Sequence, residues 1–173
     1  MRSTYSASVE NFLQTSEGKE LPIKKSAAML SNLLKREIEK IEKEGEQKAP
    51  FVLTEVNEKI IDKVYEYLDH FNGQPPKNIE KPLQTEELKN ATDEWSANFV
   101  DKIPLEDLIN LTTSASYMEI SSLIDLCCAK LACMCQNKVE EEIFKVFNIN
   151  ETFTEEEKNR LREANKWIEG NLD

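Results

Sequence analysis

The sequence contains few glycines and almost no histidine: four glycines and one histidine, His70, occur in 173 residues. Loops that cradle phosphate groups need several glycines at fixed spacing, and none of their signatures occurs here. General acid–base chemistry, or activation of a cysteine nucleophile, would depend on that single histidine. These shortages argue against a nucleotide-dependent or histidine-based catalytic site, so we expect a protein that is not an enzyme.

Basic residues are scarce relative to acidic ones. The chain has 22 Lys and Arg against 33 Asp and Glu, which gives a net charge of −11. Nucleic acids and anionic membrane surfaces both attract clustered Lys and Arg, so neither is an expected partner. The most apolar stretch, residues 123–135, is short for a membrane span and contains Asp125 and Lys130. No apolar run follows Met1, so no secretory signal is expected.

All four cysteines lie within that apolar stretch, at Cys127, Cys128, Cys133 and Cys135. A disulfide framework spreads its cysteines along the chain, and a structural zinc site needs two separated pairs of ligands. Cysteines crowded on one helix are typical of reduced thiols that pack as small apolar residues. We therefore expect no metal, no cofactor and a location in the cytosol and nucleus.

The first half of the chain combines short strand patterns with helical ones. Two short apolar runs around Ser16–Lys19 predict a β-hairpin within residues 9–23. Ser26 is the expected N-cap of a helix whose charged end runs into a loop near residues 42–50. The apolar stripe of this helix comprises Ala27, Leu30, Leu34, Ile38 and Ile41.

A second strand and helix follow this loop. The run Phe51–Thr54 predicts a strand, and Asn57 is the expected cap of a helix that ends at Asn72-Gly73. Residues 73–85 are polar and contain three prolines, which predicts an exposed, flexible loop. Trp95 and Phe99 are expected on a short helix that begins near Thr85 or Thr92.

From Pro104 onward the pattern is almost continuously helical. Helices are expected after Pro104, over residues 122–137 and 140–147, and after a capping box of Thr154 and Glu157. The last helix would turn Leu161, Ala164, Trp167 and Ile168 inward and stop at Gly170. Short strands followed by helices predict an α+β fold of one domain, or one and a half. The helix over 122–137 is apolar on more than one face, which indicates either a protein interface or packing among these helices.

Several blocks resemble one family. Residues 137–149 (NKVEEEIFKVFNI), 153–157 (FTEEE) and 162–167 (REANKW) resemble the C-terminal signature of the S-phase-kinase-associated adaptors. These small subunits link F-box proteins to a cullin in SCF ubiquitin ligases. Residues 116–125 (SYMEISSLID) resemble the family's A-N-Y-L-D-I-x-x-L-L-D stretch, and residues 15–19 (TSEGK) its S-S-D-G turn.

The resemblance implies a BTB/POZ α+β fold extended by C-terminal helices. It divides the chain into an N-terminal segment at residues 1–8, a BTB/POZ domain at 9–119 and F-box-binding helices at 120–173. The implied cullin face includes Ser116 and Tyr117, with help from the helix over 27–34. The implied F-box face comprises Leu108, Ile109, Ile124, Cys128, Leu131, Cys135, Ile149, Phe153 and Trp167.

The chain departs from the family pattern at three points. Ser116 replaces the Asn before the Tyr, Lys138-Val139 replaces a Thr-Pro pair, and cysteines replace several aliphatic F-box contacts. The alternatives are a BTB-type module that binds a partner helix or itself without a cullin, and an enzyme that uses a cysteine. An elongin-C-like adaptor would end near residues 117–119, before the two last helices. Homodimerisation of the free chain through its apolar face is a further expectation.

Overall fold

The structure is a computed structural model that describes residues 11–15, 17–44, 50–83, 85, 87–149 and 153–169 of the chain. The side chains of Glu44 and of residues 167–169, the predicted segment 1–8 and Gly170 lie outside this description. The chain divides into two compact units, residues 1–136 and 137–173, and each is described by itself. The predicted domain boundary between residues 119 and 120 stays a prediction.

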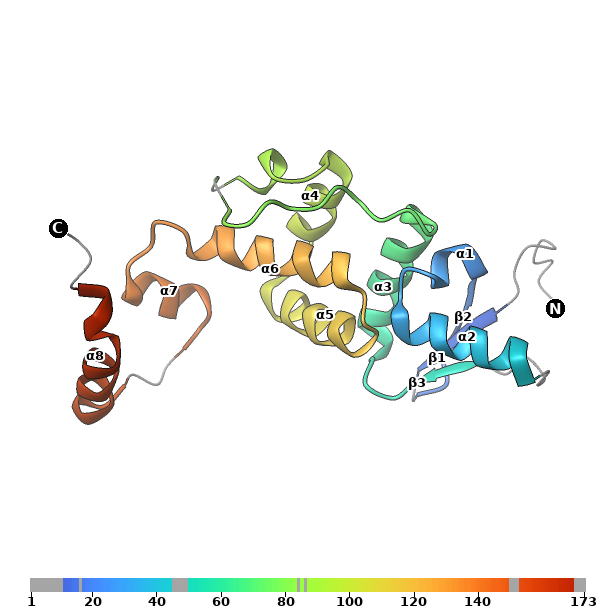
Figure 1. Ribbon diagram of the computed structural model, residues 1–173, viewed down its shortest axis with the longest axis horizontal. Coiled ribbons are helices and arrows are strands. Elements are labelled where there is room, and N and C mark those ends of the chain that lie inside the picture. Colours follow the sequence, from blue (N-terminus) through green and yellow to red (C-terminus); the bar gives the residue numbers. More distant parts are fainter. Residues whose placement is uncertain are drawn as a thin grey trace. The chain divides into compact units, whose positions relative to one another are not determined.

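A three-stranded sheet forms one side of the first unit. The strands β1 (Asn11–Thr15), β2 (Glu20–Ile23) and β3 (Phe51–Leu53) lie in the order β2-β1-β3 (Figure 1). β1 and β2 form the predicted antiparallel hairpin, whereas β3 pairs with β1 in parallel. Buried and more exposed side chains alternate along β1 and β3, so one face of these strands is buried and the other meets solvent.

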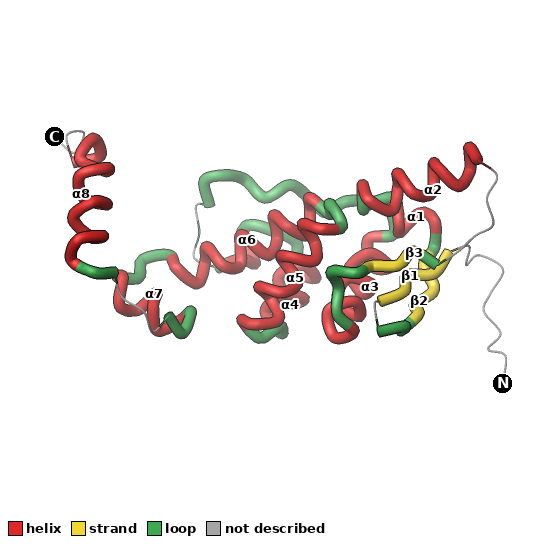
Figure 2. The backbone as a smooth tube through the Cα atoms, turned by 90° about the horizontal axis from the view of Figure 1, so that it is seen from below, coloured by secondary structure: helices red, strands yellow, loops and turns green. Residues whose placement is uncertain are grey.

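The connection from β2 to β3 runs through α1 (Lys25–Ala28) and α2 (Asn32–Glu44), which lie to one side of the strands (Figure 2). The predicted cap Ser26 is wrong, because Ser26 lies inside α1. Ser31 takes that role instead: its hydroxyl accepts a hydrogen bond of 3.1 Å from the Leu34 N–H at the start of α2. The helix continues through residues 42–44, which were predicted as loop, and residues 45–49 lie outside the described residues.

The helix α3 (Glu58–Phe71) is capped as predicted, since Asn57 accepts a hydrogen bond of 2.9 Å from the Ile60 N–H. The loop that follows is less exposed than expected, because Ile79 and Leu83 pack against the core. A short 3₁₀ helix, η1 (Leu88–Asn90), and α4 (Glu94–Asp101) come next. α4 begins next to Thr92, the second of the two predicted starts, and the Asp93 carboxylate caps the helix.

Two helices complete the first unit. α5 (Leu105–Tyr117) and α6 (Ser121–Cys135) pack against each other, and α3 and α4 pack on them in turn. The core draws on the sheet and on all of these helices. Its largest fully buried side chains are Tyr67, Leu13, Ile23, Leu34, Leu53, Ile60, Ile61, Leu68, Leu108, Leu111, Met118 and Ile120.

The second unit contains α7 (Glu140–Val146) and α8 (Glu155–Glu169). The predicted capping box is present: the Glu157 N–H donates to Thr154 Oγ1 over 3.3 Å, and the Thr154 N–H donates to Glu157 Oε2 over 2.9 Å. Leu161 and Ala164 were predicted to face inward, but both are exposed. The predicted inward side chains of Trp167 and Ile168 lie outside the described residues.

Candidate protein-interaction surfaces

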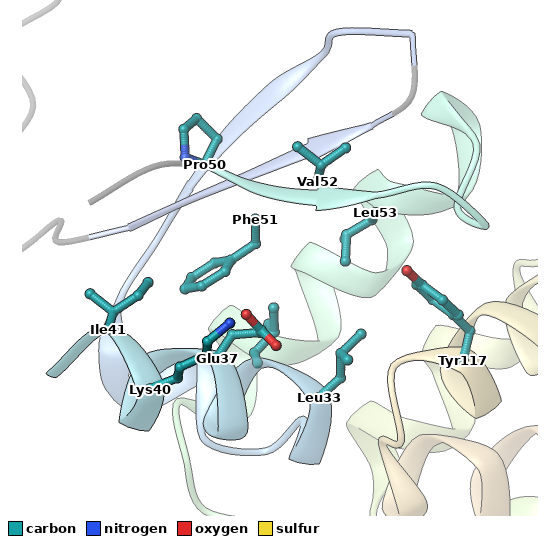
Figure 3. Close-up of a pocket in the computed structure, with 10 residues that line it drawn as sticks. Leu33, Glu37, Lys40, Ile41, Pro50, Phe51, Val52, Leu53 and Tyr117 are labelled. Carbon is teal, nitrogen blue, oxygen red and sulfur yellow. The ribbon is translucent and has the colours of Figure 1, made fainter. Parts of the chain in front are cut away.

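A hollow of about 340 Å³ lies in the first unit between α2, β3 and the end of α5. Figure 3 shows Tyr117 extending from the end of α5 towards Leu53 of β3. The hydroxyl of Tyr117 lies 3.5 Å from Thr54 Oγ1, just beyond that strand. The lining residues come from all three elements: Leu33, Leu34, Glu37, Lys40, Ile41, Pro50, Phe51, Val52, Leu53 and Tyr117.

The wall of the hollow combines apolar side chains with two opposite charges. Phe51 and Leu53 are buried, whereas Val52 is 55% exposed. Glu37 and Lys40 extend from α2 towards the strand (Figure 3). An apolar floor with a charged rim suits a partner helix that inserts one or two apolar side chains and pairs its own charges around them.

One of the two predicted cullin residues lines this hollow. Tyr117 lines it directly, and Ser116 is exposed on the preceding position of α5. The prediction included residues 27–34 but missed Glu37, Lys40 and Phe51. The sequence signal that could have identified them is the neighbouring pair Leu33-Leu34. Two adjacent apolar residues widen the apolar face of a helix, which indicates that the helix contacts a second surface.

A second candidate surface lies on α5 and α6. Ile124, Cys128, Leu131 and Cys135 recur on α6 at steps of four, three and four, which places them on one face of the helix. Cys128 is exposed and the other three are partly exposed. Ile109 on α5 is exposed as well. Leu108 differs, because its side chain is only 1% exposed and belongs to the core. Its predicted contact with a partner stays a prediction.

The second unit carries its own exposed apolar residues. Ile149 and Phe153, both predicted for the F-box face, are exposed. Trp167 lies on α8, but its side chain is outside the described residues. Val139 and Leu161 are also exposed, and neither was assigned to this face from the sequence. Exposed apolar residues in so small a unit are typical of a surface that a partner covers.

The side chains that could take part in catalysis, His70 and Cys127, serve packing instead. The ring of His70 stacks on Trp95 with centroids 3.6 Å apart and an interplanar angle of 2°. Burial raises the pKa of the Cys127 thiol to about 12, partly offset by a hydrogen bond with Thr112, so this thiol is a poor nucleophile at neutral pH. Among the described residues, no three His, Cys, Asp or Glu side chains are placed to hold a metal ion. Within the same residues, no helix has the length and apolar character needed to span a membrane.

Comparison with known proteins places this chain in a family. Residues 12–73 match the Skp1 family, tetramerisation domain, and residues 121–168 match the Skp1 family, dimerisation domain. An S-phase kinase-associated protein 1 homolog of Tetrahymena thermophila is 38% identical over 153 residues, which cover 88% of this chain and 90% of the relative. The chain belongs to the Skp1 family.

Fungal relatives extend this similarity to named ligase subunits. The E3 ubiquitin ligase complex SCF subunit sconC of Arthroderma benhamiae is 34% identical to this Skp1-family chain, covering 91% of the chain and 93% of the relative. The sconC subunit of Talaromyces marneffei is 32% identical and covers 91% of the chain and 95% of the relative. The family prediction and the predicted α+β BTB/POZ fold with C-terminal helices are therefore confirmed.

Proposed function

We propose that this chain is the non-catalytic adaptor of an SCF-type ubiquitin ligase, linking F-box substrate receptors to a cullin. The observation that carries the proposal is similarity along almost the whole chain to proteins named as an S-phase kinase-associated protein 1 homolog and as SCF subunits. The matches include both family domains, which supports an adaptor that binds one partner through each of them.

The hollow between α2, β3 and α5 is the proposed cullin site. A cullin helix would place apolar side chains against Phe51, Leu53 and Tyr117. Ser116, where the family pattern has Asn, is exposed and directly precedes Tyr117 on α5. A serine hydroxyl can make fewer hydrogen bonds than an asparagine amide. The cullin would therefore keep a contact at this position but form fewer hydrogen bonds there.

The proposed F-box contacts fall into two sets, one for each unit by itself. In the first unit they are Ile109, Ile124, Cys128, Leu131 and Cys135, which are exposed or partly exposed. In the second unit they are the exposed Ile149 and Phe153, and Trp167 by its place in the family motif. Aromatic and aliphatic anchors of this kind carry most of the free energy of a helix-binding interface. Cysteines in place of larger aliphatic residues leave more room and favour F-box sequences with bulkier side chains.

The adaptor itself performs no bond chemistry. It holds the substrate receptor on the ligase, so that ubiquitin transfer gains from the raised local concentration of the reacting groups. The four reduced cysteines fit a location in the cytosol and nucleus.

A second candidate function is a BTB-type interaction module that self-associates or binds a helix without a cullin. Ser116 favours it, because it alters the one short motif that the family resemblance assigns to cullin binding. The exposed apolar residues of the second unit would then serve a homodimer.

A co-purification experiment separates the two candidates. The purified chain is mixed with an F-box peptide and a cullin N-terminal domain, alongside the variants Tyr117→Lys and Trp167→Ala. The adaptor proposal expects the wild-type chain to bridge both, Tyr117→Lys to lose only the cullin and Trp167→Ala to lose only the peptide. Each variant is thereby the folding control of the other. If the chain binds only the peptide, the second candidate is supported. If it binds neither the peptide nor the cullin domain, both partner assignments are overturned.

A further inference from the structure

The turn that follows Tyr117 adopts a left-handed backbone at a residue that is not glycine. Glu119 has a φ of 54°. Its N–H donates to the Ser116 carbonyl over 3.1 Å, and the Ile120 N–H donates to the Ala115 carbonyl over 2.9 Å. This is the Schellman pattern, in which glycine is usual at the position of Glu119. A side chain with a Cβ is disfavoured there, so other contacts must hold the turn in this form.

Those contacts come from the start of α2 and the residue before it. The Ser31 hydroxyl donates to the Met118 carbonyl over 2.6 Å, and the Asn32 N–H donates to the Glu119 carbonyl over 3.4 Å. The Arg36 guanidinium donates two hydrogen bonds to the Glu119 carboxylate, of 2.7 Å and 2.6 Å. A two-pronged arginine–carboxylate pair fixes both direction and distance between its partners.

This pair joins two walls of the hollow. Arg36 lies on α2 between Leu33 and Glu37, which both line the hollow. Glu119 lies two residues beyond Tyr117, which forms the opposite wall. Neither Arg36 nor Glu119 lines the hollow itself. Together with the Ser31 and Asn32 hydrogen bonds, the pair therefore helps to set how far α2 stands from the end of α5, and with it the place of the Tyr117 ring.

We infer that Arg36 and Glu119 are positioning residues, which hold Tyr117 in the hollow and thereby control the docking of the partner helix there. The identity of that partner as a cullin rests on the proposed function. The inference concerns the side chains that shape the site without touching the partner.

The exposure of the pair separates this role from a general effect on folding. The side chains of Arg36 and Glu119 are 56% and 43% exposed. Exposed ion pairs contribute little to the stability of a fold, since water and salt screen them. The chain offers a matched control in Lys24 and Asp69, whose side chains are 45% and 42% exposed and which lie outside the lining of the hollow.

The test is a charge-reversal series in the full chain. The variants are Arg36→Glu, Glu119→Arg and the double variant, with Lys24→Glu as control. The readouts are the affinity for the cullin N-terminal domain, the affinity for an F-box peptide and the melting temperature. Each single reversal is expected to weaken cullin binding by about tenfold, the effect of a misplaced anchor. The double variant should return to within about threefold of wild type, because the pair is restored in the opposite sense.

F-box affinity should stay unchanged throughout, and the melting temperatures of the single variants should match that of Lys24→Glu. Unchanged cullin affinity in both single variants would overturn the inference. So would a double variant as weak as the singles, since the charges would then be acting directly on the partner.

A second readout keeps the inference testable if the wild-type chain binds no cullin, an outcome that would count against the proposed function alone. Tyrosine rings labelled with ¹³C are observed by NMR, with the Tyr117 signal assigned from Tyr117→Phe. The Tyr117 signal is expected to shift in each single reversal and to return in the double variant, while the Tyr67 signal stays in place. A Tyr117 signal that does not respond to the single reversals would refute the positioning role.

Discussion

The hydroxyl of Tyr67 on α3 donates a hydrogen bond of 2.9 Å to Ser122 Oγ at the start of α6. The Tyr67 side chain is fully buried among aromatic residues, with ring centroids 4.8 Å from Phe71 and 6.0 Å from Phe99. Burial raises the pKa of the Tyr67 hydroxyl far above its ordinary value, although the bond to Ser122 acts in the opposite direction. This hydroxyl therefore stays protonated and joins two helices that are distant in the sequence.

Removing the Tyr67 hydroxyl tests this link. Tyr67→Phe keeps the ring packing but leaves Ser122 without its donor, so the free energy of unfolding should fall by about 1 kcal/mol. The measurement is urea denaturation of the full chain. Ser122→Ala is the matched variant, because it removes the same bond from the other side. If the losses from the two single variants simply add in the double variant, the hydrogen bond does not contribute as described.

Of the two glycines that the structure describes, Gly73 is the one where a side chain would be less tolerated. It has a φ of 90°, and a Cβ built on it would lie 2.6 Å from the Ser26 carbonyl oxygen. The backbone of α1 would have to move, in addition to the strain at positive φ. We expect Gly73→Ala to lower the free energy of unfolding by about 2 kcal/mol, measured by urea denaturation.

Gly18 supplies the control for this prediction. Its φ of 92° is nearly the same, but a Cβ there would meet nothing within 4 Å. Gly18→Ala should therefore cost only the conformational strain, about 1 kcal/mol. Equal losses at the two glycines would contradict the close approach of Gly73 to Ser26.

The elements that depend on local sequence were the ones that the sequence predicted well. The hairpin, the Asn57 cap and the Thr154–Glu157 capping box each rest on residues within a few positions of one another. Ser26 failed as a cap because Ser31, five residues later, serves better: its hydroxyl accepts from Leu34 and also donates to Met118. The contact with Met118 spans 87 positions and has no local signature.

The residues of the candidate site were likewise predicted only where the local sequence indicates them. Tyr117 was found because it lies within a short motif, and α6 was found because its apolar residues cover more than one face. The α2 and β3 walls of the hollow were only partly predicted, because their residues meet through the parallel pairing of β3 with β1. Leu108 was assigned to an interface by resemblance, whereas the packing of α5 on its neighbours buries it.

The four cysteines should react with an alkylating reagent in an order set by burial. Cys128 is exposed, whereas Cys127 is buried and its pKa of about 12 leaves roughly one part in ten thousand as thiolate at pH 8. Limited iodoacetamide followed by tandem mass spectrometry should locate the first label on Cys128 and the last on Cys127. In urea the four should react alike. Early labelling of Cys127 in the folded chain would contradict its placement in the core.

The cap at the start of α4 should make part of the chain's stability depend on pH. Burial alone would raise the pKa of the Asp93 carboxyl, but hydrogen bonds from the Ser96 N–H (2.9 Å) and hydroxyl (2.6 Å) outweigh it and lower the pKa. Because the pKa is lowered in the folded chain, the charged cap stabilises the fold at pH values above the ordinary pKa of Asp. This stabilisation is lost as the pH falls below that pKa. Asp93→Ala should cost about 1 kcal/mol at pH 7, where the carboxylate accepts both bonds.

That cost should shrink at about pH 3, because the wild-type carboxyl then begins to protonate as well. Urea denaturation at the two pH values measures the difference. Asp93→Asn is the control, since its amide oxygen can still cap α4 but does not titrate in this range. Its stability relative to Asp93→Ala should be the same at both pH values. A wild-type advantage over Asp93→Ala that is equal at pH 7 and pH 3 would mean that the carboxylate charge does not stabilise the start of α4.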